Sequence, residues 1–386
     1  MTNTTAPKTV LIAPDKFKGS LTASEVADAL AAGLRAAADT SAAVHCELLP
    51  LADGGDGSVD AAVASGFGRY NCTVIGPIGQ PVQADIAFDG VTAVVEVANT
   101  CGLAVLPNAR LAPLEASSRG FGEAVLFALS LKPRRMVLAL GGSSSTDGGM
   151  GMLSALGLRF LDSSGGPLQG SGQSLSLAHS VTGSVFPGLA GVELILATDV
   201  HNPLCGPNGA APVFGPQKGC SPTDVSTLDA GLAQFVSVLV DAGLADPGLA
   251  ESPGAGSAGG IGFACLALGA KQVSGADYFL DLLDFDARKD TCDIVITGEG
   301  SIDEQTLAGK LPAAVARRSG ARPIIAVAGR SLLEPEQWSE MSLSRVYALA
   351  DYTDEDSSND PLLSAELLQR IGREIGKSLP GSLAVP

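Results

Sequence analysis

Acidic, basic and hydroxyl side chains gather in five glycine-rich loops that follow predicted strands or lie beside predicted helices. In open α/β sheets, ligands bind outside the carboxyl ends of the strands, so loops at these positions are candidates for a functional site. Carboxylates can hold Mg²⁺, while ammonium groups and open amides can hold phosphate. These are the groups that phosphoryl transfer requires, because its catalysis is mostly positioning and stabilisation of spread negative charge.

The first two loops combine carboxylates with ammonium groups or with glycines. The loop PDKFKGS comes directly after the first predicted strand and precedes a helix whose N-terminus can hold an anion. The loop ADGGDGS has two aspartates on either side of glycines, a hard-oxygen set that suits Mg²⁺. Each loop could instead be a capped turn. The candidate residues are Asp15, Lys16, Lys18 and Ser20 in the first loop, and Asp53 and Asp56 in the second.

The other three loops add hydroxyls, further acids and two lysines. GGSSSTDGG could cradle phosphate, ATDVHNPL places an acid directly after an apolar segment, and TGEGSIDEQ could hold a metal or a nucleotide. Turns and helix caps are the structural alternatives. The candidates are Ser143, Ser144, Ser145, Thr146 and Asp147; then Asp199, Asn202 and Lys218; and finally Gly298, Glu299, Gly300, Ser301, Asp303 and Lys310.

Several familiar nucleotide and catalytic signatures are missing. The sequence has no G-x-x-x-x-G-K-[ST] loop, no H-R-D or D-F-G set and no G-x-S-x-G elbow. A G-x-G-x-x-G pattern occurs at Gly254, Gly256 and Gly259, but Glu-Ser-Pro precedes it rather than an apolar strand. A nucleotide-dependent oxidoreductase that uses this loop is therefore an alternative of low rank. His201 is one of three histidines without metal-ligand spacing, so we interpret it as structural.

Composition restricts the partners of the chain. The formal net charge of −17 disfavours nucleic acid and anionic membrane surfaces as partners. No apolar run approaches the ~18 residues that would cross a bilayer, and the N-terminus lacks a signal-peptide pattern. Seven cysteines without a C-x-x-C pair are typical of reduced thiols, so we expect a cytoplasmic protein. Small molecules are the expected partners, and the oligomeric state is open between monomer and homodimer.

The segments around these loops predict two α/β domains. The pattern predicts a strand at residues 9–13, a helix at 24–38 and a second strand at 44–51. Thr22 and Glu25 form a capping box at the start of the helix. Apolar strands return near the C-terminus, whereas the middle contains short strands between Gly and Pro turns. We predict a doubly wound, flavodoxin- or Rossmann-like parallel-sheet domain from residues 1–74 and 290–386. A mixed-sheet α/β domain, residues 75–289, is inserted in it, and the active site is predicted in the cleft between the two.

The sequence resembles the bacterial glycerate kinase type 1 family in six sequence motifs, which occur in the same order as in that family. They are IAPDKFKGSLTASEVADAL, PLADGGDGSVDA, LALGGSSSTDGGMGMLSALGLRF, TDVHNPLCGPNGAAPVFGPQKG, PGAGSAGGIG and DIVITGEGSIDEQTLAGK. The resemblance implies ATP-dependent phosphorylation of D-glycerate with Mg²⁺ by a two-domain α/β protein, and it favours 2-phosphoglycerate over 3-phosphoglycerate. A kinase for another small hydroxy acid is the alternative within this chemistry. Lys16 and the run Ser144–Thr146 depart from the pattern common in the family.

We assign roles to these residues as a mechanistic hypothesis. Lys18 and Lys218 would contact the glycerate carboxylate or the transferring phosphoryl group. One of Asp53, Asp56 and Asp199 would accept the hydroxyl proton. The loop from Ser143 to Gly149 would hold phosphate. The predicted nucleotide and metal ligands are Gly298, Glu299, Gly300, Ser301 and Lys310 for the nucleotide, and Asp53, Asp56, Glu299 and Asp303 for Mg²⁺.

Overall fold

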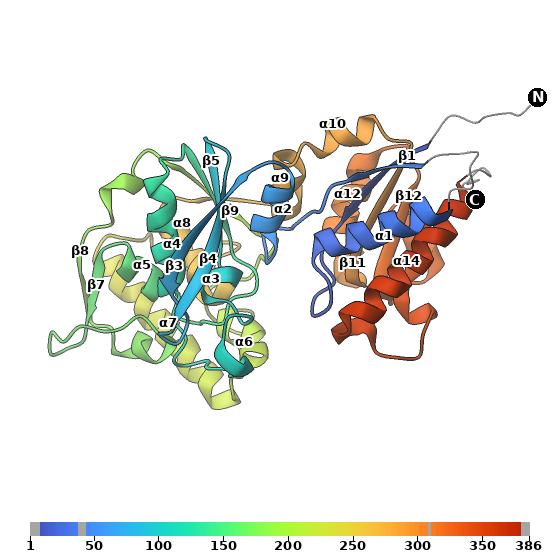
Figure 1. The fold of residues 1–386 in the computed structure, drawn as a ribbon. Coiled ribbons are helices and arrows are strands. Elements are labelled where there is room, and N and C mark those ends of the chain that lie inside the picture. Colours follow the sequence, from blue (N-terminus) through green and yellow to red (C-terminus); the bar gives the residue numbers. More distant parts are fainter. Residues whose placement is uncertain (1–7, 38–43, 308–309, 380–386) are drawn as a thin grey trace, which may run out of the picture. The chain divides into compact units, whose positions relative to one another are not determined.

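A computed structural model describes residues 8–37, 44–307 and 310–379, and its chain forms two compact units (Figure 1). The terminal unit contains Met1–Asp53 and Ala276–Pro386, and the inserted unit contains Gly54–Gly275. The sequence-based boundaries lie at 74/75 and 289/290 instead. The difference at the first boundary has a simple cause, because strand β3 (Gly68–Ile75) pairs with β4 (Pro81–Phe88) in the sheet of the inserted unit.

The terminal unit contains a five-stranded parallel sheet in the order β13-β12-β11-β1-β2. Counted along the unit, this is the 2-1-3-4-5 order of flavodoxin-like folds. The strand order reverses between β1 and β11, so the crevice at their carboxyl ends is the expected ligand position. The bounds of the strands are β1 (Lys8–Pro14), β2 (Val44–Leu48), β11 (Ile294–Ile302), β12 (Ile324–Ser331) and β13 (Arg345–Ala348).

Helices cover both faces of this sheet, as a doubly wound fold requires. Figure 1 shows α1 and α14 side by side over one face, where they bury apolar residues against β1 and β11. The two helices approach closely because a Cβ on Gly33 would lie 2.2 Å from the carbonyl oxygen of Gln369. The predicted capping box is confirmed, since the Thr22 N–H donates to Glu25 Oε2 and the Glu25 N–H donates to Thr22 Oγ1. Ala38, the last residue of the predicted helix, lies outside the described residues.

The helices of the terminal unit are ordered along the chain as follows. They are α1 (Ala23–Ala37), α9 (Gly275–Leu282), α10 (Phe285–Asp290), α11 (Glu304–Leu307), α12 (Leu311–Ser319), α13 (Pro335–Glu340) and α14 (Pro361–Ser378), with Gly275 itself in the inserted unit.

The inserted unit contains a six-stranded mixed sheet in the order β10-β9-β6-β5-β4-β3. The first four strands are parallel, and β4 and β3 complete the sheet as antiparallel strands. The two sheets confirm the predicted fold class. A separate hairpin of β7 and β8 was not predicted. The strands not yet bounded are β5 (Thr92–Glu96), β6 (Arg135–Ala139), β7 (Leu158–Leu161), β8 (Ser180–Gly183), β9 (Glu193–Ala197) and β10 (Lys271–Val273).

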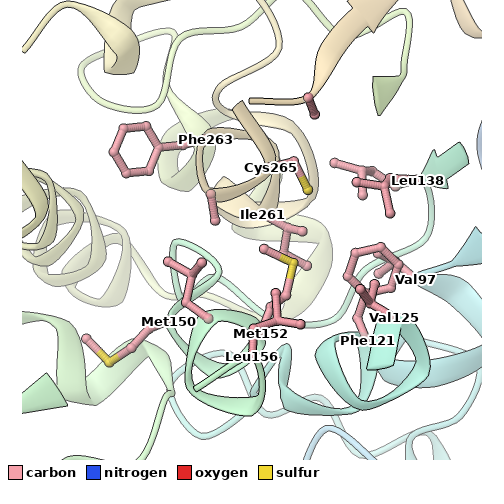
Figure 2. Close-up of a cluster of buried hydrophobic side chains, with 14 of the residues drawn as sticks. Val97, Phe121, Val125, Leu138, Met150, Met152, Leu156, Ile261, Phe263 and Cys265 are labelled. Atoms are coloured by element: carbon pink, nitrogen blue, oxygen red, sulfur yellow. The ribbon is translucent and has the colours of Figure 1, made fainter. Parts of the chain in front are cut away.

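A large apolar core holds the sheet and helices of the inserted unit together. Figure 2 shows part of it, with Phe121 and Val125 from α4, Leu138 from β6 and Ile261 from α8. Each of these side chains is buried. The helices are α2 (Ser58–Ala64), α3 (Ala98–Cys101), α4 (Arg119–Ser130), α5 (Met150–Ala155), α6 (Ala210–Phe214), α7 (Pro222–Asp241) and α8 (Ile261–Ala267).

Two whole-chain features bear on the sequence expectations. Among the described residues, no helix is both long enough and apolar enough to cross a membrane. All seven cysteines are free thiols.

Candidate functional site

Three carboxylates gather at the point in the terminal unit where the strand order reverses. Asp15 directly follows β1, and its N–H donates to the carbonyl oxygen of Gly298 in β11 at 2.8 Å. Burial, together with the nearby charges of Asp53 and Glu299, raises the pKa of Asp15 to about 7 against the lowering effect of Lys16. Like charges therefore oppose one another at the carboxyl ends of β1 and β11.

Glu299 is held in place by its neighbours and has a similarly perturbed carboxyl group. Burial raises the pKa of Glu299 to about 7, while a hydrogen bond from Thr306 and the charge of Lys310 lower it. The Thr306 Oγ1 hydroxyl donates to Glu299 Oε1, and it also accepts from the Asp303 N–H at 3.1 Å. These bonds fix the start of α11 beside β11. A carboxyl group with a pKa near neutrality at the end of a parallel strand is typical of functional sites.

Glycines let the backbone pack closely in this region. A Cβ on Gly298 would lie 2.2 Å from the carbonyl oxygen of Val327, so no larger residue fits between β11 and β12. Gly300 lies against the backbone of Phe17 and Lys18, which brings the PDKFKGS loop next to β11. Lys18 itself is exposed. Ser20 is bonded elsewhere, because its hydroxyl donates to Ser364 Oγ of α14 at 2.7 Å.

The carboxylates of the terminal unit suit a magnesium ion that brings some of its own ligands. Among the described residues, no group of three His, Cys, Asp or Glu side chains could hold a metal ion by itself. Mg²⁺ usually binds one or two carboxylates and completes its shell with water and substrate phosphates. The mutual repulsion at Asp15 and Glu299 is the electrostatic situation that a divalent cation relieves. The donor chemistry therefore fits Mg²⁺ bound together with phosphate.

Lys218 is the central group of the inserted unit's loops, and it is almost completely buried. Its ammonium donates to Ser143 Oγ and to the carbonyl oxygen of Ser145. Burial lowers its pKa to about 8, against the opposing effects of Asp147, Cys101 and Cys220. Lys218 therefore joins the segment after α6 to the GGSSSTDGG loop after β6.

Asp147 anchors the other end of the same loop. Its carboxylate is fully buried and accepts from the Ser118 N–H and hydroxyl, the Gly149 N–H and the Gly151 N–H. Burial raises its pKa, and these four hydrogen bonds lower it. The Ser118 hydroxyl also accepts from the Met152 N–H, so the starts of α4 and α5 are bonded together. Asp147 stabilises the loop from within.

The hydroxyl side chains of this loop point inward. The Ser144 hydroxyl donates to the carbonyl oxygen of Cys101 at 2.8 Å, while Ser143 is occupied by Lys218. Ser145 and Thr146 are fully buried, and their hydroxyl oxygens have no hydrogen-bond partner. The hydroxyls of Ser143 and Ser144 are thus bonded within the protein, whereas those of Ser145 and Thr146 are buried without a partner.

The loop with the G-x-G-x-x-G pattern packs against the GGSSSTDGG loop. A Cβ on Gly259 would lie 2.1 Å from the carbonyl oxygen of Ser145, and one on Gly256 would lie 2.2 Å from that of Pro203. The pattern follows a short 3-10 turn, residues 249–251, and not a strand. The glycines are thus required for close packing within the chain, and the dinucleotide alternative gains no support from them.

Asp56 and Asp199 lie at the carboxyl ends of the inserted unit's parallel strands. The ADGGDGS loop meets the end of β6, because a Cβ on Gly141 would lie 2.4 Å from Gly55 Cα. Asp199 follows β9, and its Oδ1 accepts from the Gly275 N–H at 3.0 Å. Asn202 donates to the carbonyl oxygen of Asn208, and His201 is exposed.

Comparison with known proteins identifies the protein family of this chain. A family model described as the glycerate kinase family matches residues 10–379. The chain belongs to the glycerate kinase family. It is 39% identical over 327 residues to the glycerate 2-kinase of Escherichia coli K12, covering 83% of this chain and 84% of the relative. It is 37% identical over 379 residues to a glycerate kinase of Bacillus subtilis 168, covering 96% and 97%.

A solved structure agrees with this membership. The crystal structure of a glycerate kinase 2 candidate from Salmonella typhimurium LT2 matches with a TM-score of 0.79 and 34% identity. The match covers 97% of this chain and 98% of that one. The enzyme therefore has the fold of its family over nearly its whole length.

The predicted site residues of this enzyme fall into two groups, one in each unit. The terminal unit contains Asp15, Lys16, Lys18, Ser20, Asp53, Gly298, Glu299, Gly300, Ser301, Asp303 and Lys310. The inserted unit contains Asp56, Ser143, Ser144, Ser145, Thr146, Asp147, Asn202, Asp199 and Lys218.

Sequence reasoning missed three residues that hold the candidate loops in place. Glu96 is buried at the end of β5 and accepts from the Val59 N–H at 3.0 Å, which fixes the start of α2 behind the ADGGDGS loop. Ser118 and Thr306 bond the carboxylates of Asp147 and Glu299. Glu96 has a readable signal, because a charged residue ends an otherwise apolar strand. The partners of the two hydroxyls have no such local signal.

Proposed function

We propose that the enzyme transfers the γ-phosphoryl group of ATP to the O2 hydroxyl of D-glycerate and forms 2-phosphoglycerate. Membership of the glycerate kinase family and the name of the Escherichia coli relative, glycerate 2-kinase, support this choice of oxygen. The type 1 subdivision suggested by the sequence blocks and a cytoplasmic location are parts of the same proposal. The free thiols are in keeping with a reducing compartment.

One observation supports the site more than any other. Two carboxyl groups with pKa values near 7, Asp15 and Glu299, lie at the strand-order reversal of a flavodoxin-like sheet. We propose that Glu299 and Asp303 hold Mg²⁺ together with ATP oxygens, and that Lys310 attracts the same phosphates. The ion would neutralise charge on the transferring phosphoryl group. Lys16 and Lys18 would attract the glycerate carboxylate or the phosphoryl group.

The proton acceptor for the glycerate hydroxyl is proposed to lie in the terminal unit. A general base works best when its pKa is near the working pH. The Asp15 carboxyl group, whose pKa is raised to about 7 by burial and by Asp53, meets this requirement. The charge of Asp53 has the largest effect on this pKa after burial, and Asp53 remains the alternative acceptor. Loops of the inserted unit would present backbone N–H groups to phosphate.

The product spectrum tests the proposal directly. The enzyme is incubated with ATP, MgCl₂ and D-glycerate, and the product is examined by proton-coupled phosphorus NMR. A phosphate on O2 couples to the single proton on that carbon and gives a doublet, whereas a phosphate on O3 couples to two protons and gives a triplet. A triplet would contradict the choice of oxygen, and unchanged ATP and glycerate would contradict the function.

Replacing Lys18 tests the proposed substrate contact. Because an exposed ammonium group beside β11 would act on a negative substrate, Lys18→Ala should lower kcat/KM for glycerate about 100-fold, roughly 3 kcal/mol of transition-state stabilisation. Lys8→Ala is the matched control, since Lys8 is an exposed lysine of the same unit that pairs with Asp293. The control should keep nearly full activity. A fully active Lys18→Ala enzyme would remove Lys18 from the mechanism.

A further inference from the structure

We propose that Asp199 is a positioning residue that fixes one of the two chain crossings between the units, and that it does not accept the substrate proton. The inference deepens the proposed function and rests on ATP being the phosphoryl donor. Sequence reasoning placed Asp199 among the candidate proton acceptors, because it is an acid directly after an apolar strand.

The hydrogen bond of Asp199 lies at a crossing. The chain passes between the units at Asp53–Gly54 and at Gly275–Ala276. Asp199 Oδ1 accepts from the N–H of Gly275, which is the first residue of α9. The first N–H groups of a helix have no partner within the helix, and a carboxylate there also interacts favourably with the helix dipole. Asp199 is therefore a helix cap supplied by a distant loop, 76 residues away in the sequence.

The body of α9 is bonded to the terminal unit. Arg317 of α12 donates to both carboxylate oxygens of Asp277, at 2.6 and 2.8 Å. Arg318 donates to the carbonyl oxygen of Asp277 at 3.2 Å and pairs with Asp281 at 2.6 Å. The helix is thus tied to α12 by its body and to the β9 loop by its first residue. The chain therefore passes from one unit to the other within the first residues of α9.

The other crossing is anchored at the same strand end. Gly54 has a φ of +82°, and a Cβ on it would lie 2.4 Å from the carbonyl oxygen of Ala197. Ala197 is the last residue of β9 and lies two positions before Asp199. Both crossings are therefore fixed by the segment 197–199 of the inserted unit. Short hinge segments of this kind often change kcat and KM together when they are altered, although they lie away from the reacting atoms.

The conservative variant separates the two roles of Asp199. The amide oxygen of Asp199→Asn can still accept from the Gly275 N–H, but an amide cannot serve as a proton acceptor in catalysis. Asp199→Ala removes both abilities. Asp229→Asn is the matched control, since Asp229 is a half-buried aspartate of the same unit whose Oδ1 accepts from the Gly206 N–H at 3.0 Å.

The experiment compares these variants in three measurements on the full-length enzyme. They are steady-state kinetics, the ratio of ADP released to phosphoglycerate formed, and hydrogen exchange of the peptides that contain Gly275. We expect Asp199→Asn and Asp229→Asn to stay within about threefold of the parent in kcat. Asp199→Ala should lose about tenfold or more in kcat, exchange faster at Gly275 because that N–H loses its acceptor, and release more ADP per phosphoglycerate formed.

Two outcomes would overturn the inference. The first is an Asp199→Asn enzyme as slow as Asp199→Ala while the Gly275 amide stays protected, which would show that the carboxylate itself is needed for chemistry. The second is an Asp199→Ala enzyme with unchanged exchange and unchanged coupling. If Asp199→Ala fails to fold, Asp199→Ser provides the same comparison. A parent enzyme that forms no phosphoglycerate from ATP would instead contradict the proposed function, and the exchange of Gly275 would still test the anchor.

Discussion

The two units prepare their candidate loops in opposite ways. In the terminal unit, Asp15 and Glu299 are carboxyl groups whose burial and like-charged neighbours raise their pKa values to about 7. In the inserted unit, Lys218 and Asp147 are also buried, but hydrogen bonds within the protein surround both of them. Like charges oppose one another in the first arrangement, and a cation or a proton can relieve this repulsion; in the second, the charged groups bond loop segments to one another. The difference teaches that a buried charge points to a bound ligand when like charges surround it, and to a structural role when it bonds segments of its own fold.

The largest expected effect comes from removing the buried Asp147 carboxylate of the inserted unit. Asp147→Ala leaves three buried N–H groups and the Ser118 hydroxyl without their acceptor, and should lower the free energy of unfolding by roughly 3–5 kcal/mol. Urea unfolding followed by circular dichroism measures this loss. Asp224→Ala is the control, because Asp224 makes the same kind of capping bonds at the exposed start of α7. It should cost about 1 kcal/mol. Equal losses of unfolding free energy in the two variants would contradict the expected difference between the buried Asp147 and the exposed Asp224.

A change of opposite sign is expected in the terminal unit. Because the Glu299 carboxylate is charged and destabilised above pH 7, Glu299→Gln should raise the free energy of unfolding at pH 8 by roughly 2 kcal/mol. The amide oxygen can still accept from Thr306. The same variant should lose the stabilisation that millimolar MgCl₂ gives the parent.

Thermal unfolding with and without MgCl₂ checks both statements. Glu193→Gln is the control of opposite sign, since Arg135 and Lys271 lower the pKa of Glu193 and its removal should reduce stability. A Glu299→Gln enzyme that is less stable than the parent would show that the carboxylate is not strained.

The smallest expected effect is a pH dependence in the inserted unit. The pKa of Lys218 is lowered to about 8 in the folded protein from an ordinary value of 10.5. Between these values the unfolded chain keeps a proton that the folded protein has lost, so this group makes stability rise with pH. From pH 8 to 9.5 the gain should be about 1–2 kcal/mol in the parent relative to Lys218→Met.

Urea unfolding at several pH values gives the difference between the two proteins. Ser143→Ala removes one hydrogen-bond acceptor but keeps the ammonium group, and should keep the pH dependence. Identical pH profiles for the parent and Lys218→Met would mean that burial does not perturb this lysine.

Signals that act over a few residues were readable in the sequence. The capping box of α1 depends on side chains three positions apart, so Thr22 with Glu25 identified the start of this helix. Uninterrupted apolar runs identified β1, β11 and β12, because strands of a parallel sheet are buried on both faces. The six family blocks predicted the fold class and the glycerate kinase family for the same reason, since they depend on residue order alone.

Only the tertiary structure decided which candidate groups are open and which are already bonded. The partners of Lys218, Asp199 and Glu96 lie 75, 76 and 37 positions away in the sequence. No local pattern specifies such a contact, because it follows from how the strand ends are brought together. The sequence by itself determined the kinds of groups at the carboxyl ends of the strands. Folding then left Asp15 and Glu299 strained and turned the GGSSSTDGG hydroxyls inward, because burial makes each polar group depend on the partners that the fold supplies.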